Sequence, residues 1–315
     1  MTMRIAVFGA GGVGGYFGGR LAEAGEDVAF IARGRHLHAL KAKGLRVDSI
    51  AGDFALTSVQ ATDDPREIGP VDIVLVGVKA WQVAEAASAM RPLLGVETCV
   101  VPLQNGVEAP ARLAAELGPE RVLGGLCSLI VFTAGPGHLC HAGGEPRIEF
   151  GELDNSASER TRRLLNAFAR AKGLTAEIPT DIHAALWEKF LFIAPWSGVG
   201  AVTRAPIGIL RSQPESRRVL EQAMQEVEQV GRARGIALPP GVLSRTITLL
   251  EAMPADGTTS MQRDIMSGHP SELDTQNGAV VWLGRETGVE TPVNTLIYRC
   301  LLPLELRARG QLQFE

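Results

Sequence analysis

The residues with the clearest chemical meaning stand near the start of the chain, in a glycine-rich segment. A short apolar run, Arg4–Phe8, leads directly into a G-x-G-x-x-G pattern made up of Gly9, Ala10, Gly11, Gly12, Val13 and Gly14. In such patterns the first glycine permits a tight turn, the second lets the backbone approach a pyrophosphate, and the third lets a helix pack closely on the strand. The N–H groups at the helix start then bind phosphate. A plain βα turn is the alternative, but the strand before and the helix after favour a dinucleotide site.

A basic residue after the second expected strand indicates the type of dinucleotide. Residues 27–32 form that strand, and Arg33 follows it. NAD-binding versions carry an Asp or Glu here that bonds the ribose 2′-hydroxyl. A guanidinium instead pairs with a 2′-phosphate. Arg33 therefore predicts NADPH, with a solvated strand-end residue as the alternative.

Two further polar residues follow buried strands. Lys79 ends the apolar run 71–78, and Asn105 comes just after the strand 98–103. The carboxyl ends of parallel strands face the ligand crevice of such folds. We therefore expect both residues near the cofactor, against the alternatives of a solvated lysine and an asparagine that tolerates a turn.

A lysine lies on the apolar face of a helix expected over 182–196. The neighbours of Lys189 three and four residues away are all apolar: Ala185, Leu186, Phe192 and Ile193. Burial lowers the pKa of an ammonium group, which suits a proton donor near neutral pH. The alternative is a long stem that carries the charge to water. Ile193 and Ser197 follow Lys189 at intervals of four and share its face if the helix continues past Pro195.

Two later stretches carry polar groups ahead of helices. Residues 258–264 form a hydroxyl-rich turn that contains Ser260, and Glu272 lies in the stretch 271–274. Both are candidates for ligand binding. In both, capping of the following helix is the alternative reading.

The elements that must position these residues change in kind near Pro179. Before it, strands and helices alternate, which predicts an α/β fold with a Rossmann-type, doubly wound parallel sheet. After it, only helices are expected, over 182–196, 214–234, 242–251, 273–288 and 293–309. We therefore expect an NADPH-binding domain over residues 1–179 and an all-helical substrate and dimerisation domain over 180–315.

Composition narrows the classes of function. The length of 315 residues suits two domains. A net charge of −4 gives no reason to expect nucleic acid or an anionic membrane as partner, and no apolar stretch approaches the roughly 18 residues that span a bilayer. The four widely spaced cysteines fit neither a disulfide framework nor a metal site. They predict reduced, mostly buried thiols in a cytoplasmic protein.

Taken together, these motifs make the chain similar to the ketopantoate reductases (2-dehydropantoate 2-reductases). The resemblance covers essentially the whole chain and rests on the glycine pattern and on five further stretches: 78–80, 104–106, 187–189, 260–265 and 271–274. It implies a Rossmann domain followed by a helical domain like the C-terminal domain of 6-phosphogluconate dehydrogenase. It also implies reduction of a 2-oxo acid, ketopantoate, to the 2-hydroxy acid with NADPH, on the pathway to pantothenate.

The resemblance also implies roles for single residues. Lys189 is the general acid, which bonds the ketone oxygen and donates the proton. Lys79 and Asn105 contact cofactor and substrate. Ser260 binds the substrate carboxylate, and Glu272 binds the ribose side of the cofactor.

Three positions depart from the family pattern. Ile193, Ser197 and Gly257 stand where the family commonly has asparagine. A site that has lost hydrogen-bonding groups discriminates less strongly for a substrate hydroxyl. The sequence therefore predicts a 2-oxo-acid reductase more firmly than it predicts ketopantoate.

Two other classes stay open at this stage. One is a related β-hydroxyacid or opine-type dehydrogenase that acts on a different carbonyl. The other is a non-catalytic, NADPH-sensing Rossmann protein, against which the lysine on an apolar face argues. An apolar surface on the last two helices could serve a homodimer.

Overall fold

The computed structural model describes residues 2–314, which form two compact units. The first unit runs up to Gln104 and then from Ala109 to Ile182. The second consists of Asn105–Glu108 and the residues from His183 onward. The division after Ile182 lies just beyond Pro179, where the sequence predicts the boundary. The sequence did not predict that Asn105–Glu108 belongs with the helical unit.

A parallel sheet is the centre of the first unit, as predicted. Its strand order is β5-β2-β1-β6-β7, and every neighbouring pair is parallel. The strands are β1 (Arg4–Phe8), β2 (Asp27–Ile31), β5 (Gln60–Thr62), β6 (Val71–Val76) and β7 (Leu94–Pro102). β5 was not predicted, because three residues show no periodicity.

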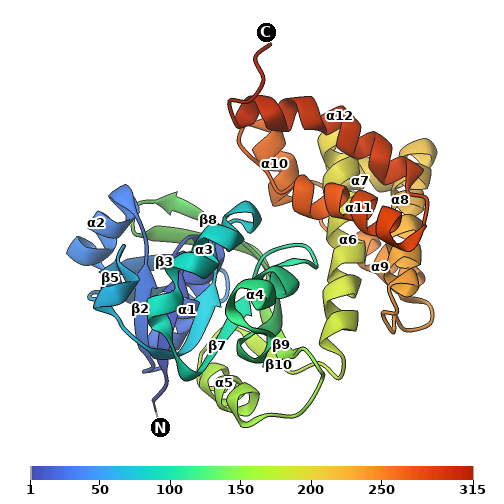
Figure 1. Cartoon of the computed structure of the whole chain (residues 1–315). Helices are drawn as coiled ribbons and strands as arrows, with labels where there is room; N and C mark the ends of the chain where they lie inside the picture. The colour runs from blue at the N-terminus through green and yellow to red at the C-terminus, as the bar shows by residue number, and fades with distance from the viewer. Residues whose placement is uncertain (1, 315) are drawn as a thin grey trace. The chain divides into compact units, whose positions relative to one another are not determined.

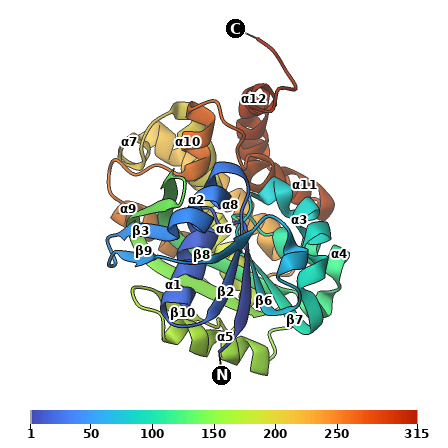
Figure 2. The same ribbon diagram turned by 90° about the vertical axis from the view of Figure 1, so that its left-hand side faces the viewer.

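Alternate residues of β1 face two separate cores. Ile5 and Val7 pack in one core with α1, whereas Ala6 and Phe8 pack in another with α3 and α4. Because side chains of a strand alternate between faces, this five-residue strand is apolar on both sides. Figure 2 shows the resulting layers of the Rossmann unit, with α1 on one side of β2 and β6 and with α3 and α4 on the other. The helices are α1 (Gly12–Glu23), α2 (Gly34–Lys43), α3 (Val83–Ala89), α4 (Ala109–Leu117) and α5 (Glu159–Ala169).

A second sheet covers the far side of α1, and the sequence did not predict it. Its order is β10-β9-β3-β4, with β8 paired antiparallel to β9. The strands are β3 (Leu45–Ser49), β4 (Phe54–Leu56), β8 (Leu123–Gly135), β9 (His138–Glu152) and β10 (Thr175–Glu177). The sequence pattern over 44–57, 122–153 and 174–178 predicts strands in these stretches. Their pairing with one another depends on contacts distant in the sequence, such as β3 with β9, which periodicity does not reveal.

The second unit is helical, as predicted, and α6 is its longest helix (Figure 1). α6 (Ile182–Thr203) continues past Pro195, where the sequence left its end open. α7 (Ile207–Ser212) was missed because it is only six residues long. The others are α8 (Pro214–Ala233), α9 (Val242–Ala252), α10 (Ser260–Met266), a π-helical turn η5 (Asp274–Gly278), α11 (Ala279–Thr287) and α12 (Pro292–Ala308). Within residues 2–314, no helix is long and apolar enough to cross a membrane.

The cysteines agree only partly with the prediction. All four are free thiols, but only Cys99 and Cys127 are buried, whereas Cys140 is half-buried and Cys300 is exposed. Burial raises the pKa of the Cys99 thiol to about 12, so this group stays protonated at neutral pH.

A buried carboxylate organises the start of α12. Glu226 of α8 is 6% exposed and accepts hydrogen bonds from the backbone N–H groups of Val293 and Asn294 at 2.7 and 2.9 Å. The Asn294 side chain donates to the same carboxylate and accepts from Asn277 of η5. A negative charge at a helix N-terminus is favourable, and here it also ties three helical segments together.

We predict that Glu226→Ala lowers the free energy of unfolding by about 3 kcal/mol, because it leaves buried N–H groups without an acceptor. Urea unfolding of the two variants and the parent measures this. Glu228→Ala is the matched control: the Glu228 carboxylate, two residues further along α8, pairs with Arg232 near the surface, and such a pair is worth at most about 0.5 kcal/mol. Equal stability of the Glu226 and Glu228 variants would contradict this account.

Candidate active site

Two glycines of the turn after β1, Gly9 and Gly14, are required by close contacts, whereas Gly11 is not. Gly9 has φ +100°, and a Cβ there would lie 2.8 Å from the backbone nitrogen of Val78. A Cβ on Gly14 would lie 2.2 Å from the Gly9 carbonyl oxygen and 3.0 Å from Val7 of β1. Gly11 differs from both, since its φ of −72° suits any residue and no atom lies within 4 Å of a Cβ placed on it. Packing thus explains Gly9 and Gly14, whereas the space at Gly11 is open.

The helix that follows begins inside the glycine pattern. The sequence predicts a helix over 16–24, but α1 starts four residues earlier, at Gly12, with Gly11 as its N-cap. No side chain caps this end, and its first turn contains no acidic residue. The first N–H groups of α1, from Gly12 and Val13 onward, therefore stand directly at the turn. This is the arrangement that binds a phosphate group.

Arg33 and Lys79 both follow strands of the parallel sheet and are both exposed. Arg33 is the N-cap of α2, and its Nη2 lies 3.0 Å from Oε1 of Glu85 on α3. Lys79 follows β6, with its Nζ 5.6 Å from the centroid of the Trp81 ring. Their positions at strand ends agree with the sequence analysis, and the Glu85 carboxylate is a neighbour of Arg33 that the sequence did not indicate.

Gln104 is a structural residue of this edge that the sequence analysis missed. Its side chain is 5% exposed, and Nε2 donates to the carbonyl oxygens of Val76 and Val78 at 2.8 and 2.9 Å. It thereby ties the end of β7 to the end of β6, immediately before Lys79. In the sequence, the one signal for this role is an amide side chain directly after a buried strand.

In the helical unit, a cluster of three polar side chains forms around Glu272. Its Oε2 accepts from Nδ2 of Asn105 at 3.1 Å and from Nε2 of Gln276 at 3.4 Å. Glu272 is 7% exposed and Gln276 is fully buried, with Oε1 of Gln276 unpartnered among the described residues. The sequence predicted Asn105 and Glu272 as site residues, and the structure brings them together. It did not single out Gln276.

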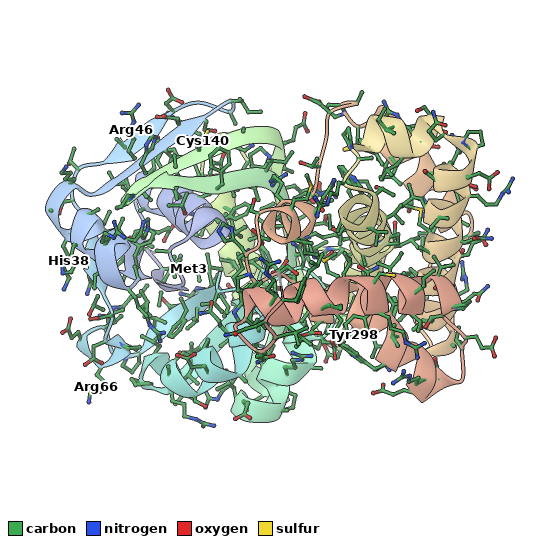
Figure 3. All side chains as sticks on the ribbon, turned by 90° about the horizontal axis from the view of Figure 1, so that it is seen from above. Met3, His38, Arg46, Arg66, Cys140 and Tyr298 are labelled. Atoms are coloured by element: carbon green, nitrogen blue, oxygen red, sulfur yellow. The ribbon has the colours of Figure 1, made fainter. Side chains whose placement is uncertain are left out.

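Gln276 of this cluster belongs to the π-helical turn η5. A π-turn inserts an extra residue into a helix and occurs frequently at functional sites. Here it begins at Asp274, which accepts a hydrogen bond from the Tyr298 hydroxyl at 3.1 Å. Burial, reinforced by Asp274, raises the pKa of Tyr298 to about 12, so this hydroxyl stays a donor. Tyr298 lies on α12 (Figure 3).

Lys189, Ile193 and Ser197 are three residues of one continuous helix, α6. Lys189 and Ile193 are half-buried. Ser197 is fully buried, and its Oγ has no hydrogen-bond partner among the described residues. An unpartnered buried hydroxyl costs free energy unless something binds it. Ser197 is therefore a candidate to contact a bound molecule.

Ser260 and Gly257 lie at the start of α10. Thr259 caps this helix by accepting from the Gln262 N–H at 3.2 Å, so capping does not account for Ser260, the first helical residue. At Gly257, a Cβ would lie 2.9 Å from the Pro254 carbonyl oxygen. An asparagine at this position would need a different backbone path. The departure from the family pattern is therefore built into the turn.

Comparison with known proteins agrees with this arrangement. Residues 5–155 match the family described as Ketopantoate reductase PanE/ApbA, and residues 181–305 match its C-terminal domain. The chain belongs to the ketopantoate reductase family. It is therefore an oxidoreductase of an NAD(P)-dependent family that acts on CH–OH groups. These matches confirm the family that the sequence motifs predicted.

Individual relatives match over nearly their whole length. The 2-dehydropantoate 2-reductase of Mesorhizobium japonicum is 32% identical over 92% of this chain and 94% of its own. A crystal structure of a PanE/ApbA family ketopantoate reductase from Ralstonia eutropha is 33% identical, with a TM-score of 0.87 over 98% of this chain and 100% of its own. A ternary structure of D-mandelate dehydrogenase with NADH and anilino(oxo)acetate has a TM-score of 0.88 over 98% of this chain and 99% of its own. At 21% identity, it shows the shared fold alone.

We predict that alanine at Gly14 lowers the stability of the protein, whereas alanine at Gly11 weakens cofactor binding. Gly14→Ala lowers stability by about 3 kcal/mol, because the methyl group collides with backbone. Gly11→Ala changes stability by less than about 1 kcal/mol but raises the Kd for NADPH at least about tenfold, because the methyl group occupies space that a pyrophosphate needs. Thermal unfolding and fluorescence titration with NADPH measure the two effects. Unchanged NADPH binding by Gly11→Ala would contradict the assignment of this turn.

Proposed function

We propose that this protein reduces 2-dehydropantoate, or a closely related branched 2-oxo acid, to the 2-hydroxy acid with NADPH. The observation that carries the proposal is the retention of Lys189 on an apolar stretch of α6, in a chain that matches the reductase family over both units. A non-catalytic NADPH sensor has no need of a lysine in such a place. The relative from Mesorhizobium japonicum, a 2-dehydropantoate 2-reductase, supports the same reaction.

In this proposal Lys189 is the general acid. Its ammonium group donates a hydrogen bond to the ketone oxygen and stabilises the negative charge that develops there as hydride reaches the carbonyl carbon. It then transfers a proton to that oxygen, which completes the hydroxyl group. NADPH, when bound, supplies the hydride.

Glu272 is proposed to bind a ribose hydroxyl of the cofactor. Asn105 and Gln276 both donate to its Oε2, which leaves Oε1 to accept from a hydroxyl group. Two donors on one oxygen also fix the rotamer of the carboxylate. Asn105 and Gln276 are therefore positioning residues for the Glu272 carboxylate.

NADPH is proposed over NADH because of Arg33. Its guanidinium is 65% exposed and already forms an ion pair with Glu85, a pair that exposure makes weak. A 2′-phosphate carries more charge than a carboxylate and can displace Glu85. Lys79 adds a second cation after β6, which lies on the other side of β1 from β2 in the sheet.

The substrate end is proposed to involve Ser260, Ile193 and Ser197. Ser260 is assigned to the substrate carboxylate, since Thr259 performs the capping. Ile193 and Ser197 replace amides with a branched apolar group and a short hydroxyl. This change favours a substrate with an apolar branch and weakens selection for a second hydroxyl group.

We predict that Lys189→Ala lowers kcat with 2-dehydropantoate by about 10²- to 10⁴-fold, the usual contribution of a general acid. The Kd for NADPH should stay within about threefold of the parent value, because the glycine turn is untouched. Steady-state kinetics and fluorescence titration separate the two. The control is Lys172→Ala, which removes an exposed lysine of the other unit. Full turnover by the Lys189 variant would exclude its role as the acid.

We also predict that Arg33→Asp reverses cofactor preference. Loss of a charge-assisted pair of about 1.5–3 kcal/mol lowers kcat/KM for NADPH roughly 10- to 100-fold, while kcat/KM for NADH is unchanged or higher. Arg35→Asp is the matched control, since Arg35 is also exposed and its substitution makes the same change in net charge. An equal loss in both variants would show only a general charge effect and would remove the role of Arg33.

A further inference from the structure

His36 joins the glycine turn to a distant hairpin. It lies in the first turn of α2, and its Nε2 is 2.8 Å from the carbonyl oxygen of Ala10. Its Nδ1 accepts the backbone N–H of Gly137, at the turn between β8 and β9, at 3.1 Å. Because Nδ1 accepts, it carries no proton, and the ring proton is on Nε2. His36 is therefore neutral here and donates to Ala10.

The bond to Ala10 fixes the direction of a different group, the N–H of Gly11. The Ala10 carbonyl and the Gly11 N–H belong to one planar trans peptide, in which they point in opposite directions. Holding the carbonyl toward α2 therefore turns the Gly11 N–H away from α2. No atom lies within 4 Å of a Cβ at Gly11, so side-chain packing does not restrain this peptide.

The rest of the turn is held by other contacts. The N–H groups of Gly9 and Ala10 both donate to the Ile31 carbonyl of β2, each at 3.1 Å. These bonds fix the peptides before Ala10, and helical bonding fixes the chain from Gly11 onward, where the Gly15 N–H donates to the Gly11 carbonyl at 2.7 Å. The Ala10–Gly11 peptide lies between these two regions, and its carbonyl is bound by His36.

The residue that donates to Nδ1 of His36, Gly137, is itself held in place by contacts with other elements. Gly137 is buried with φ +73°, and a Cβ there would lie 3.1 Å from Ala39 of α2. Its carbonyl accepts the Arg46 N–H of β3 at 2.9 Å. The hairpin turn is thereby anchored to both α2 and β3. It holds the imidazole in the orientation that places Nε2 on Ala10.

We propose that His36 is a positioning residue for the dinucleotide pyrophosphate: it directs the Gly11 N–H toward the phosphate and keeps the Ala10 carbonyl oxygen away from it. The inference rests on the proposed binding of a dinucleotide at this turn. A rotated Ala10–Gly11 peptide would present the negative end of a carbonyl dipole to the phosphate oxygens. Loss of His36 therefore weakens cofactor binding without touching the carbonyl chemistry.

Three substitutions at His36 separate this role from a purely structural one. His36→Ala removes both bonds. In His36→Gln the amide nitrogen takes the place of Nε2 and can restore the bond to Ala10. In His36→Asn the amide reaches only the position of Nδ1 and can restore only the bond to Gly137. The control is His38→Ala on the same helix, because His38 is exposed and projects outward (Figure 3).

The experiment measures the Kd for NADPH by fluorescence titration, together with KM and kcat for both substrates. We expect His36→Ala and His36→Asn to raise the Kd and KM for NADPH about tenfold, the value of one well-placed hydrogen bond. At saturating NADPH, kcat and the KM for the 2-oxo acid stay at the parent values. His36→Gln stays within about threefold of the parent, and His38→Ala is unchanged.

Unchanged NADPH binding by His36→Ala would overturn the role of His36, and so would NADPH binding by His36→Asn as tight as that by His36→Gln. A parallel loss of kcat, of both KM values and of the melting temperature in His36→Ala would also overturn it, because it would mark a general structural defect. Failure of the parent protein to bind either NADPH or NADH would instead remove the dinucleotide site itself. That outcome is seen before any variant is made.

Discussion

The close contact between α1 and β1 is the constraint on which the first unit depends. Gly14 lies so near the Gly9 carbonyl that no side chain fits between helix and turn. Gly77, at the end of β6, is equally close to both, since a Cβ there would lie 2.8 Å from the Gly14 Cα. Absence of side chains at these points brings the first N–H groups of α1 to the carboxyl ends of the strands. An arrangement suited to anion binding therefore follows from packing, and within the turn 9–14 Gly11 is the glycine that packing does not require.

Buried polar groups have the corresponding role in the helical unit. Glu226 bonds the start of α12, and Asn294 extends that network to Asn277 of η5. At the other side of η5, Gln276 and Asn105 hold the Glu272 carboxylate. The π-helical turn is thus fixed from both sides by hydrogen bonds. Buried polar networks of this kind specify one arrangement only when their members are satisfied. Among residues 2–314, Oε1 of Gln276 and Oδ1 of Asn277 have no hydrogen-bond partner, and they mark where this network is incomplete.

Local patterns in the sequence predicted the parts of the fold that depend on local physics. The parallel sheet followed from continuous apolar strands, and α6 followed from an apolar helical stretch. The second sheet could not be predicted, because the pairing of β3 with β9 is set by cores formed far along the chain. The continuation of α6 past Pro195 could not be predicted either. It depends on tertiary packing, which compensates for the hydrogen bond that proline removes.

The candidate site was predictable where a motif has its own mechanism. The glycine turn, Arg33 and Lys189 each carry a chemical reason that is visible in one stretch. Gln276 and His36 carry none, because their significance lies in the backbone and side-chain atoms they contact. Asn105 was predicted at a strand end, yet its hydrogen bond to Glu272 spans more of the chain than any pattern covers.

The most direct test of this account is the rate of NADPH oxidation by the purified protein with 2-dehydropantoate, measured beside a set of other branched and unbranched 2-oxo acids. The account predicts saturable turnover with 2-dehydropantoate or another branched 2-oxo acid, and slower turnover with NADH. NADPH oxidation only when an amino acid is added to a 2-oxo acid, turnover only as NADP⁺ reduction by 3-hydroxy acids, or tight NADPH binding without oxidation by any carbonyl compound would contradict it.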